Sequence, residues 1–281
     1  MTIDKKKKIL SEVPIPARPE ILVQVTNAFK ESEPNLHSIA QMVGKDVGLS
    51  AAILQVVNSP FFGLSTKISS IQQAMALLGV KKILMLVRSV SVRNVSKNAS
   101  KLTDFWDTAN EIANICVETA SLIKLRDRDD VFSLGLFHAC GIPIMMEYFS
   151  DYADFYASAY TSERPLIELE TERYEVNHAQ ISGLLCRNWF LPSDVIVAVE
   201  NYHRPFSILL NRFPEHQSKL TMIAILKASI GINYQLNKMH RNNISVGTDW
   251  ARDYKDVLGF LGISETDFVS FEDFLLDKFN Q

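Results

Sequence analysis

The chain has 281 residues, of which 47% are hydrophobic and 22% charged, and its formal net charge is −3 at pH 7. This length allows a substantial buried core, and the composition is that of a folded protein rather than a disordered one. The small net charge gives no global attraction to nucleic acid or to an anionic membrane. The three cysteines are widely spaced and form no C-x-x-C pair, so a disulfide framework is excluded and a reducing compartment is favoured.

The N-terminal segment does not have the pattern of a targeting signal. Four lysines, at positions 5 to 8, are followed by only two apolar residues before polar ones return. A signal peptide needs a longer apolar region, and no other stretch approaches the length of a membrane-spanning helix. We therefore expect a cytoplasmic protein without membrane contact.

The first quarter of the chain repeats apolar residues at helical spacing. Helices are predicted near residues 19–29 and 35–43, the second behind an Asn35 cap. A third begins near residue 46 and ends at Asn58, because the proline at position 60 disfavours helical geometry just before it. Asn58 is expected to bind backbone groups that hold the following turn. A fourth helix is predicted from residue 70, with Gly79 in left-handed geometry at its end.

The central part of the chain continues in the same way. Thr103 is predicted to cap a helix that extends to about residue 117. The apolar run of residues 131–146 contains Gly141 and Pro143, so we expect it to be kinked or split. Asn177 is predicted to cap another helix, and residues 191–193 to separate two helices. Tyrosines recur every four residues at 152, 156 and 160, which favours one half-buried helix face.

No Asn-Gly or Asp-Gly hairpin signal is present, and alternating apolar stretches are few. The sequence therefore predicts an all-α protein. Polar or proline-containing stretches suggest three parts: an N-terminal helical lobe (1–101), a central helical lobe (102–210) and a helical C-terminal extension (211–281).

Residues 46–79 resemble the core motif of the HDOD family, the HD-related output domain of bacterial signalling proteins. The shared letters include Asn58-Ser59, Phe62-Gly63, Lys67-Ile68-Ser69-Ser70-Ile71 and Leu77-Leu78-Gly79. The resemblance extends over residues 13–205. It implies an N-terminal helical lobe packed on a degenerate HD domain, which is the helical fold of metal-dependent phosphohydrolases.

The central lobe resembles an HD domain that has lost ligands. Residues 135–142 resemble the segment that carries the His-Asp doublet, where His138 matches the histidine and Ala139 replaces the aspartate. Upstream, Thr108 replaces the first histidine ligand. Downstream, His178 and His203 match two further histidine segments. The resemblance thus leaves three imidazoles and removes the doublet carboxylate.

A hydrolytic site for hard divalent metals needs carboxylate oxygens, which Ala139 and Thr108 do not supply. We therefore predict no catalytic residue, no cofactor-binding residue and no bound metal. His138, His178 and His203 are the candidates for a remnant pocket. An alternative stays open, because three neutral histidines can hold a zinc ion with one open position.

The resemblance implies a non-catalytic regulatory module in signal transduction, which binds a partner protein or a small signalling ligand. The alternative is a metal-dependent phosphohydrolase acting on nucleotides or cyclic dinucleotides. A third class, direct nucleic-acid binding, is not expected, although one stretch is free of acids and contains six basic residues: Lys81, Lys82, Arg88, Arg93, Lys97 and Lys101.

Overall fold

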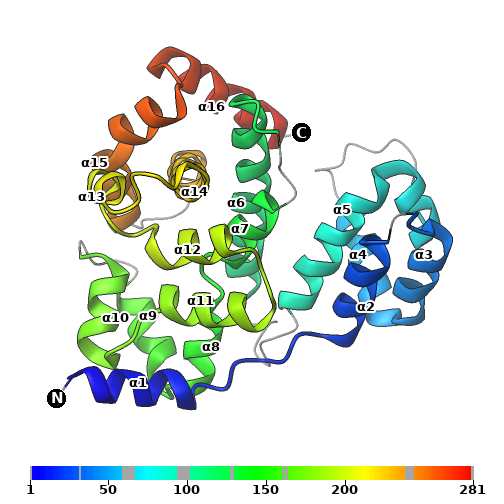
Figure 1. Ribbon diagram of the computed structural model, residues 1–281, viewed down its shortest axis with the longest axis horizontal. Helices are drawn as coiled ribbons and strands as arrows, with labels where there is room; N and C mark the ends of the chain where they lie inside the picture. Colours follow the sequence, from blue (N-terminus) through cyan, green and yellow to red (C-terminus); the bar gives the residue numbers. More distant parts are fainter. Residues whose placement is uncertain are drawn as a thin grey trace. The chain divides into compact units, whose positions relative to one another are not determined.

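The computed structural model is built from helices (Figure 1). It describes residues 2–31, 33–58, 67–93, 102–126, 130–159, 162, 164–237 and 244–279. Every regular element within these ranges is a helix, so the all-α prediction is confirmed.

The chain divides into two compact units. Unit 1 comprises residues 1–16 and 96–273, and unit 2 comprises residues 17–95 and 274–281. The three-part division suggested by the sequence is not tested by this partition and stays a prediction.

Unit 2 contains four helices in its N-terminal segment: α2 (Glu20–Phe29), α3 (Leu36–Lys45), α4 (Val47–Val57) and α5 (Ile71–Arg93). The predicted Asn35 cap is confirmed, since its side chain accepts a hydrogen bond from the Ser38 backbone at 2.9 Å. Asp46 caps α4 in the same way through Leu49, also at 2.9 Å. Each cap satisfies a backbone N–H that a helix start leaves unpaired.

Asn58 follows α4 and acts as predicted. Its amide nitrogen donates to the carbonyl oxygens of Leu54 at 2.7 Å and Ile68 at 2.8 Å. Its carbonyl oxygen accepts from the Ile68 backbone N–H at 2.7 Å. The side chain therefore ties the end of α4 to the chain that leads into α5. The motif residues between positions 59 and 66 lie outside the described ranges.

Gly79 lies inside α5 at a kink, with φ 79° and ψ 162°. The positive φ is confirmed and explains the glycine, because side chains with a Cβ rarely adopt it. The first helical segment ends at this kink as predicted, and the chain continues helical from there to Arg93, so that α5 spans both segments. Lys97 and Lys101 lie outside the described residues, so their predicted alignment with Arg93 is untested.

Unit 1 contains the remaining helices. They are α1 (Thr2–Glu12), α6 (Thr103–Leu122), α7 (Val131–Phe137), α8 (Gly141–Tyr148), α9 (Tyr152–Ala159), α10 (Leu166–Tyr174), α11 (His178–Asn188), α12 (Ser193–Asn201), α13 (Phe206–Arg212), α14 (Gln217–Leu236) and α15 (Ile244–Leu261). The last helix, α16 (Glu265–Phe279), begins in unit 1 and ends in unit 2.

The apolar run of the central lobe is split into α7 and α8, as its glycine and proline predicted. Within the described residues, Val131–Tyr148 is also the one stretch with the length and composition of a membrane span. Because 83% of it is buried inside the structure, it forms part of the core of unit 1.

Other helix ends in unit 1 test the remaining predictions. Asn177 caps α11 as predicted, and the boundary predicted at residues 191–193 is confirmed, since α11 ends at Asn188 and α12 begins at Ser193. The Thr103 cap is wrong: Leu102 is the N-cap of α6, without a side-chain hydrogen bond, and Thr103 is the first helical residue. Tyr152 and Tyr156 stack on one face of α9, with ring centroids 6.2 Å apart. Tyr160 lies outside the described residues.

Candidate functional site: the imidazole cluster of unit 1

A capping box places His178 at the first position of α11. The Asn177 side chain accepts a hydrogen bond from the Gln180 N–H at 3.1 Å, and the Gln180 side chain accepts one from the Asn177 N–H at 3.4 Å. The preceding helix stops at Glu175, whose backbone is left-handed with φ 65°. These two local signals set the turn from which His178 enters the interior, where it is 2% exposed.

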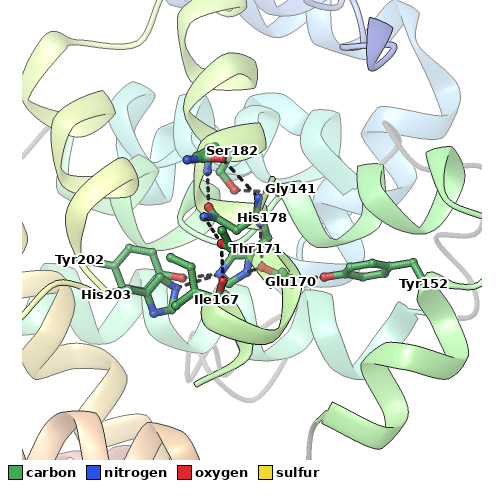
Figure 2. Close-up of polar contacts among 11 residues, drawn as sticks. Gly141, Tyr152, Ile167, Glu170, Thr171, His178, Ser182, Tyr202 and His203 are labelled. Carbon is green, nitrogen blue, oxygen red and sulfur yellow. Dashed lines mark hydrogen bonds and ion pairs between the residues drawn. The ribbon is translucent and has the colours of Figure 1, made fainter. Parts of the chain in front are cut away.

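Glu170, on α10, is the hydrogen-bond acceptor at the centre of the site and is fully buried. Figure 2 shows its carboxylate between Tyr152 and His178. It accepts from the Tyr152 hydroxyl, from the His178 backbone N–H at 2.9 Å and from His178 Nδ1 at 2.7 Å. Burial raises the pKa of Tyr152 well above its usual value, and the charge of Glu170 adds to this effect. The phenol therefore stays protonated and donates a hydrogen bond to Glu170.

The second ring nitrogen of His178 is also engaged (Figure 2). The Tyr202 hydroxyl lies 3.0 Å and His203 Nε2 lies 2.9 Å from His178 Nε2. With the proton on Nδ1 directed at Glu170, Nε2 of a neutral imidazole is an acceptor. Burial raises the pKa of Tyr202 well above its usual value, so its hydroxyl serves as a donor.

His138 joins the cluster through Tyr202. Its Nδ1 lies 2.6 Å from the Gly135 carbonyl oxygen, to which it donates. Its ring meets the Tyr202 ring edge to face, at a centroid distance of 5.6 Å. Burial lowers the pKa of His138 to about 4, an effect that the Gly135 carbonyl opposes and His178 strengthens. Burial also lowers the pKa of His203 well below its usual value, and the nearby His178 lowers it further. Both imidazoles are therefore neutral at pH 7.

Close packing of α8 on α11 holds the backbone of this site. A Cβ built on Gly141 would lie 2.1 Å from the His178 carbonyl oxygen, so only glycine fits there. The Gly141 N–H donates to Ser182 Oγ, on the next turn of α11, at 2.7 Å. The glycine that splits the apolar run thus also lets the two helices touch at His178.

A buried ion pair holds the chain just beyond His203. Lys227 on α14 pairs with Asp253 on α15, and both side chains are almost fully buried. Asp253 also accepts a hydrogen bond from the Phe206 backbone N–H at 3.0 Å. The turn that presents Tyr202 and His203 is therefore fixed at its far end by α14 and α15.

Thr108 and Ala139 stand at the positions where an HD domain carries its first metal ligand and its doublet carboxylate. The Thr108 hydroxyl donates to the Asp104 carbonyl oxygen of its own helix at 2.6 Å. Ala139 is buried, 7% exposed, and offers only a methyl group. Within the ranges that the structure describes, no three His, Cys, Asp or Glu side chains are arranged to hold a metal ion. The donor set therefore does not fit the hydrolytic metal centre of the fold.

Sequence reasoning named the three histidines but not the residues that connect them. The structure brings His178 and His203 into contact and links His138 to them through Tyr202. Glu170 was missed because nothing in its local pattern distinguishes it from an exposed helical glutamate. Spacing gives no signal either, because α10 ends at Tyr174 and the left-handed Glu175 breaks the helical register before His178.

Comparisons with other proteins agree with this architecture. A protein of Treponema pallidum (strain Nichols) with no described function is 25% identical over 198 residues, which are 67% of this chain and 37% of that protein. YuxH of Bacillus subtilis (strain 168) is 30% identical over 105 residues, which are 37% of this chain and 24% of YuxH. The chain thus spans well under half the length of these relatives.

Solved structures show the same fold. A candidate phosphohydrolase from Shewanella amazonensis superposes with a TM-score of 0.72 at 19% identity, covering 98% of this chain and 93% of that one. An HDOD domain protein of unknown function from Geobacter sulfurreducens superposes with a TM-score of 0.66 at 16% identity, covering 96% of this chain and 95% of that one.

The HDOD domain family matches residues 15–205, which include the Asn58 motif of unit 2 and the histidine cluster of unit 1. The chain therefore belongs to the HDOD domain family.

Proposed function

We propose that this protein is a non-catalytic regulatory module that acts in cytoplasmic signal transduction by binding a partner protein or a small signalling ligand. One observation carries the proposal: His178 uses both ring nitrogens inside the protein, on Glu170 at one side and on Tyr202 and His203 at the other. A metal-ligating histidine also directs one N–H to a carboxylate, as His178 does to Glu170, but it must offer the lone pair of its other nitrogen to the metal. In this arrangement the lone pair is already a hydrogen-bond acceptor.

The missing carboxylate supports the same conclusion. A two-metal phosphohydrolase neutralises its cations with carboxylates and activates water between them. Ala139 and Thr108 leave the site with imidazoles alone, and the buried carboxylate of Glu170 is committed to Tyr152 and His178. A domain that keeps its fold but not its ligands is suited to binding and conformational signalling.

The competing function is metal-dependent hydrolysis of nucleotides or cyclic dinucleotides, and one assay separates the two. Protein purified without chelator is incubated with these substrates and magnesium, manganese or iron, and metal content is measured in parallel. We expect no turnover and substoichiometric metal. Metal-dependent turnover that disappears in His138→Ala would overturn the proposal, whereas turnover that persists in this variant would indicate a contaminating enzyme.

A further inference from the structure

Exposed apolar side chains are concentrated on α16, the last helix of the chain (Figure 1). Among the described residues eight large apolar side chains are exposed, and three of them lie on this helix: Val269, Phe274 and Leu276. A single exposed apolar side chain needs no explanation, but several on one element indicate an interaction surface. The helix lies beyond residues 15–205, which the HDOD domain family matches, so this surface belongs to the C-terminal extension.

The inner face of α16 is packed against α15. Ser264 caps the helix, because its hydroxyl oxygen accepts a hydrogen bond from the Asp267 N–H at 3.1 Å. The Phe268 ring, one turn later, packs on the rings of Trp250 and Tyr254, with centroid distances of 5.6 Å to each. The buried stripe of the helix consists of Phe268, Phe271 and Leu275.

The opposite side of α16 combines apolar and acidic side chains. A second stripe at helical spacing contains Val269, Glu272, Asp273 and Leu276. Glu272 is half-buried and the other three are exposed. Because α16 is one continuous helix, the helix itself sets the positions of these side chains relative to one another. We call these four residues the α16 outer face.

The charge on this helix is almost entirely negative. Its charged residues are five acids, Glu265, Asp267, Glu272, Asp273 and Asp277, and one base, Lys278. Lys278 does not lie on the outer face, since its Nζ stands over the Phe274 ring at 5.7 Å from the centroid. Burial raises the pKa of Glu272, and the adjacent charge of Asp273 raises it further. The two carboxylates at the centre of the outer face therefore repel each other, and a cation placed against them would relieve this repulsion.

An apolar stripe with acids at its centre selects its partner by complementarity. Apolar contacts attract, and charges determine which partners are rejected. Nucleic acids, anionic membranes and the same face of a second copy are all negative and are repelled. A basic amphipathic helix has both features that the face requires, because its apolar ridge can cover Val269 and Leu276 while its cations pair with the carboxylates.

We propose that the α16 outer face is the docking surface for a basic amphipathic helix of a partner protein. This inference rests on the proposed regulatory function and specifies the class of partner. It places recognition in the C-terminal extension and leaves the buried cluster of unit 1 a structural role.

The test uses the full-length chain and three fluorescein-labelled model peptides. The first has leucines at helical spacing and lysines elsewhere, the second has glutamates in place of the lysines, and the third has the composition of the first in an order without an apolar face. Fluorescence anisotropy measures the Kd of each. We expect the first peptide to bind, the shuffled peptide to bind at least about tenfold more weakly, and the glutamate peptide not to bind.

Charge reversal on the helix tests the electrostatic part. Combining Glu272→Lys with Asp273→Lys should weaken binding of the lysine peptide at least about tenfold and create binding of the glutamate peptide, because both attractions become repulsions. The matched control combines Asp154→Lys with Glu168→Lys, which makes the same change in net charge at exposed positions of α9 and α10. It should leave the Kd within about twofold, since salt screens distant charges. Melting curves verify that both variants are folded.

The apolar part has its own variant, Val269→Ser combined with Leu276→Ser. Both side chains are exposed, so the fold should tolerate the change, and the lysine peptide should again bind at least about tenfold more weakly. Sedimentation of the unmodified chain checks for a dimer that this variant abolishes, which would assign the face to a second copy and overturn the inference.

Three further results would also overturn it. Equal losses in the two charge-reversed variants would reduce the binding to a general attraction between opposite net charges. Binding that no α16 variant weakens would place the peptide elsewhere, and absence of binding would remove the face as a docking surface. Each of these leaves the regulatory function standing, whereas metal-dependent hydrolysis would defeat the regulatory function itself.

Discussion

The two units satisfy their key polar side chains in different ways. In unit 1, Glu170, His178 and His203 come from separate elements and bind one another over sequence separations of 8 and 25 residues; the first two are buried and His203 is half-buried. In unit 2, Asn58 is neutral and binds backbone groups 4 and 10 residues away. A buried network of ionisable groups is sensitive to pH and to the loss of any member. An amide that binds neighbouring backbone groups does not titrate, and its removal costs only its own hydrogen bonds. The two arrangements therefore differ in their expected response to pH and in the size of the expected loss on mutation.

The largest expected effect is at Glu170. Replacing it with alanine leaves the Tyr152 hydroxyl and the His178 Nδ1–H and backbone N–H without their acceptor at a fully buried position. A buried donor left without its acceptor typically costs about 1–3 kcal/mol, and three donors are affected, so we expect a loss of at least about 3 kcal/mol in the free energy of unfolding. Urea denaturation of unit 1, followed by tryptophan fluorescence, measures it.

Glu170→Gln is the control for this prediction, since it keeps one oxygen acceptor and the shape of the side chain. It should lose less stability than Glu170→Ala. Equal stability of wild type and Glu170→Ala would mean that the network does not hold α10 to α11.

The second effect is the pH dependence of unit 1. Burial lowers the pKa of His138 from 6.5 to about 4 in the folded protein, so folding favours its neutral form. The contribution of this group to stability is complete above pH 6.5 and is lost as the pH falls from 6.5 to about 4. A shift of this size corresponds to roughly 3 kcal/mol, and the lowered pKa of His203 acts in the same direction. Melting temperatures measured between pH 7.5 and pH 4 follow the loss.

His138→Asn provides the comparison, because its amide can still donate to the Gly135 carbonyl but does not titrate. The variant should have a flatter stability profile over this pH range. A slope identical to that of wild type would assign the acid sensitivity to other groups.

The third effect concerns unit 2. Asn58→Ala removes three hydrogen bonds to backbone groups of Leu54 and Ile68. Hydrogen bonds of this kind contribute about 1 kcal/mol each, and the loss is partly offset by water at this half-buried position, so we expect about 1–2 kcal/mol. Because Asn58 does not titrate, the loss should be the same at pH 5 and pH 7.5. A pH-dependent loss would remove the distinction between the two units.

The same contrast explains what could be predicted from the sequence. The Asn35 and Asn177 caps, the role of Asn58 and the split between α7 and α8 depend on neighbours a few residues away, and all were predicted. The Thr103 cap was wrong because more than one residue near the start of a helix can be the N-cap, and here the helix begins one residue earlier, with Leu102 as its N-cap.

Contacts between residues of different helices could not be predicted from the sequence. The family resemblance identified His138, His178 and His203, but the pairing of His178 with Glu170 and Tyr202 depends on how α9 to α12 pack. Local periodicity contains no information on that packing. For the same reason the sequence could suggest a remnant pocket of three histidines. It could not predict that Tyr202 and His203 are hydrogen-bond partners of His178 Nε2.

The smallest expected effect links the two kinds of interaction, because Asn177 is a local cap that positions the long-range network. Asn177→Ala removes the side-chain acceptor for the Gln180 N–H and should cost about 1 kcal/mol as a cap. If the cap also fixes the entry of His178, the variant should in addition weaken the contact with Glu170, which lies 2.7 Å from His178 Nδ1. The measurement is a double-mutant cycle of Asn177→Ala and Glu170→Gln. A coupling free energy above about 0.5 kcal/mol would show that the cap positions the network, because independent sites add within that margin. Strict additivity would reduce Asn177 to a helix cap and leave the packing of Gly141 against His178 as the feature that aligns the cluster.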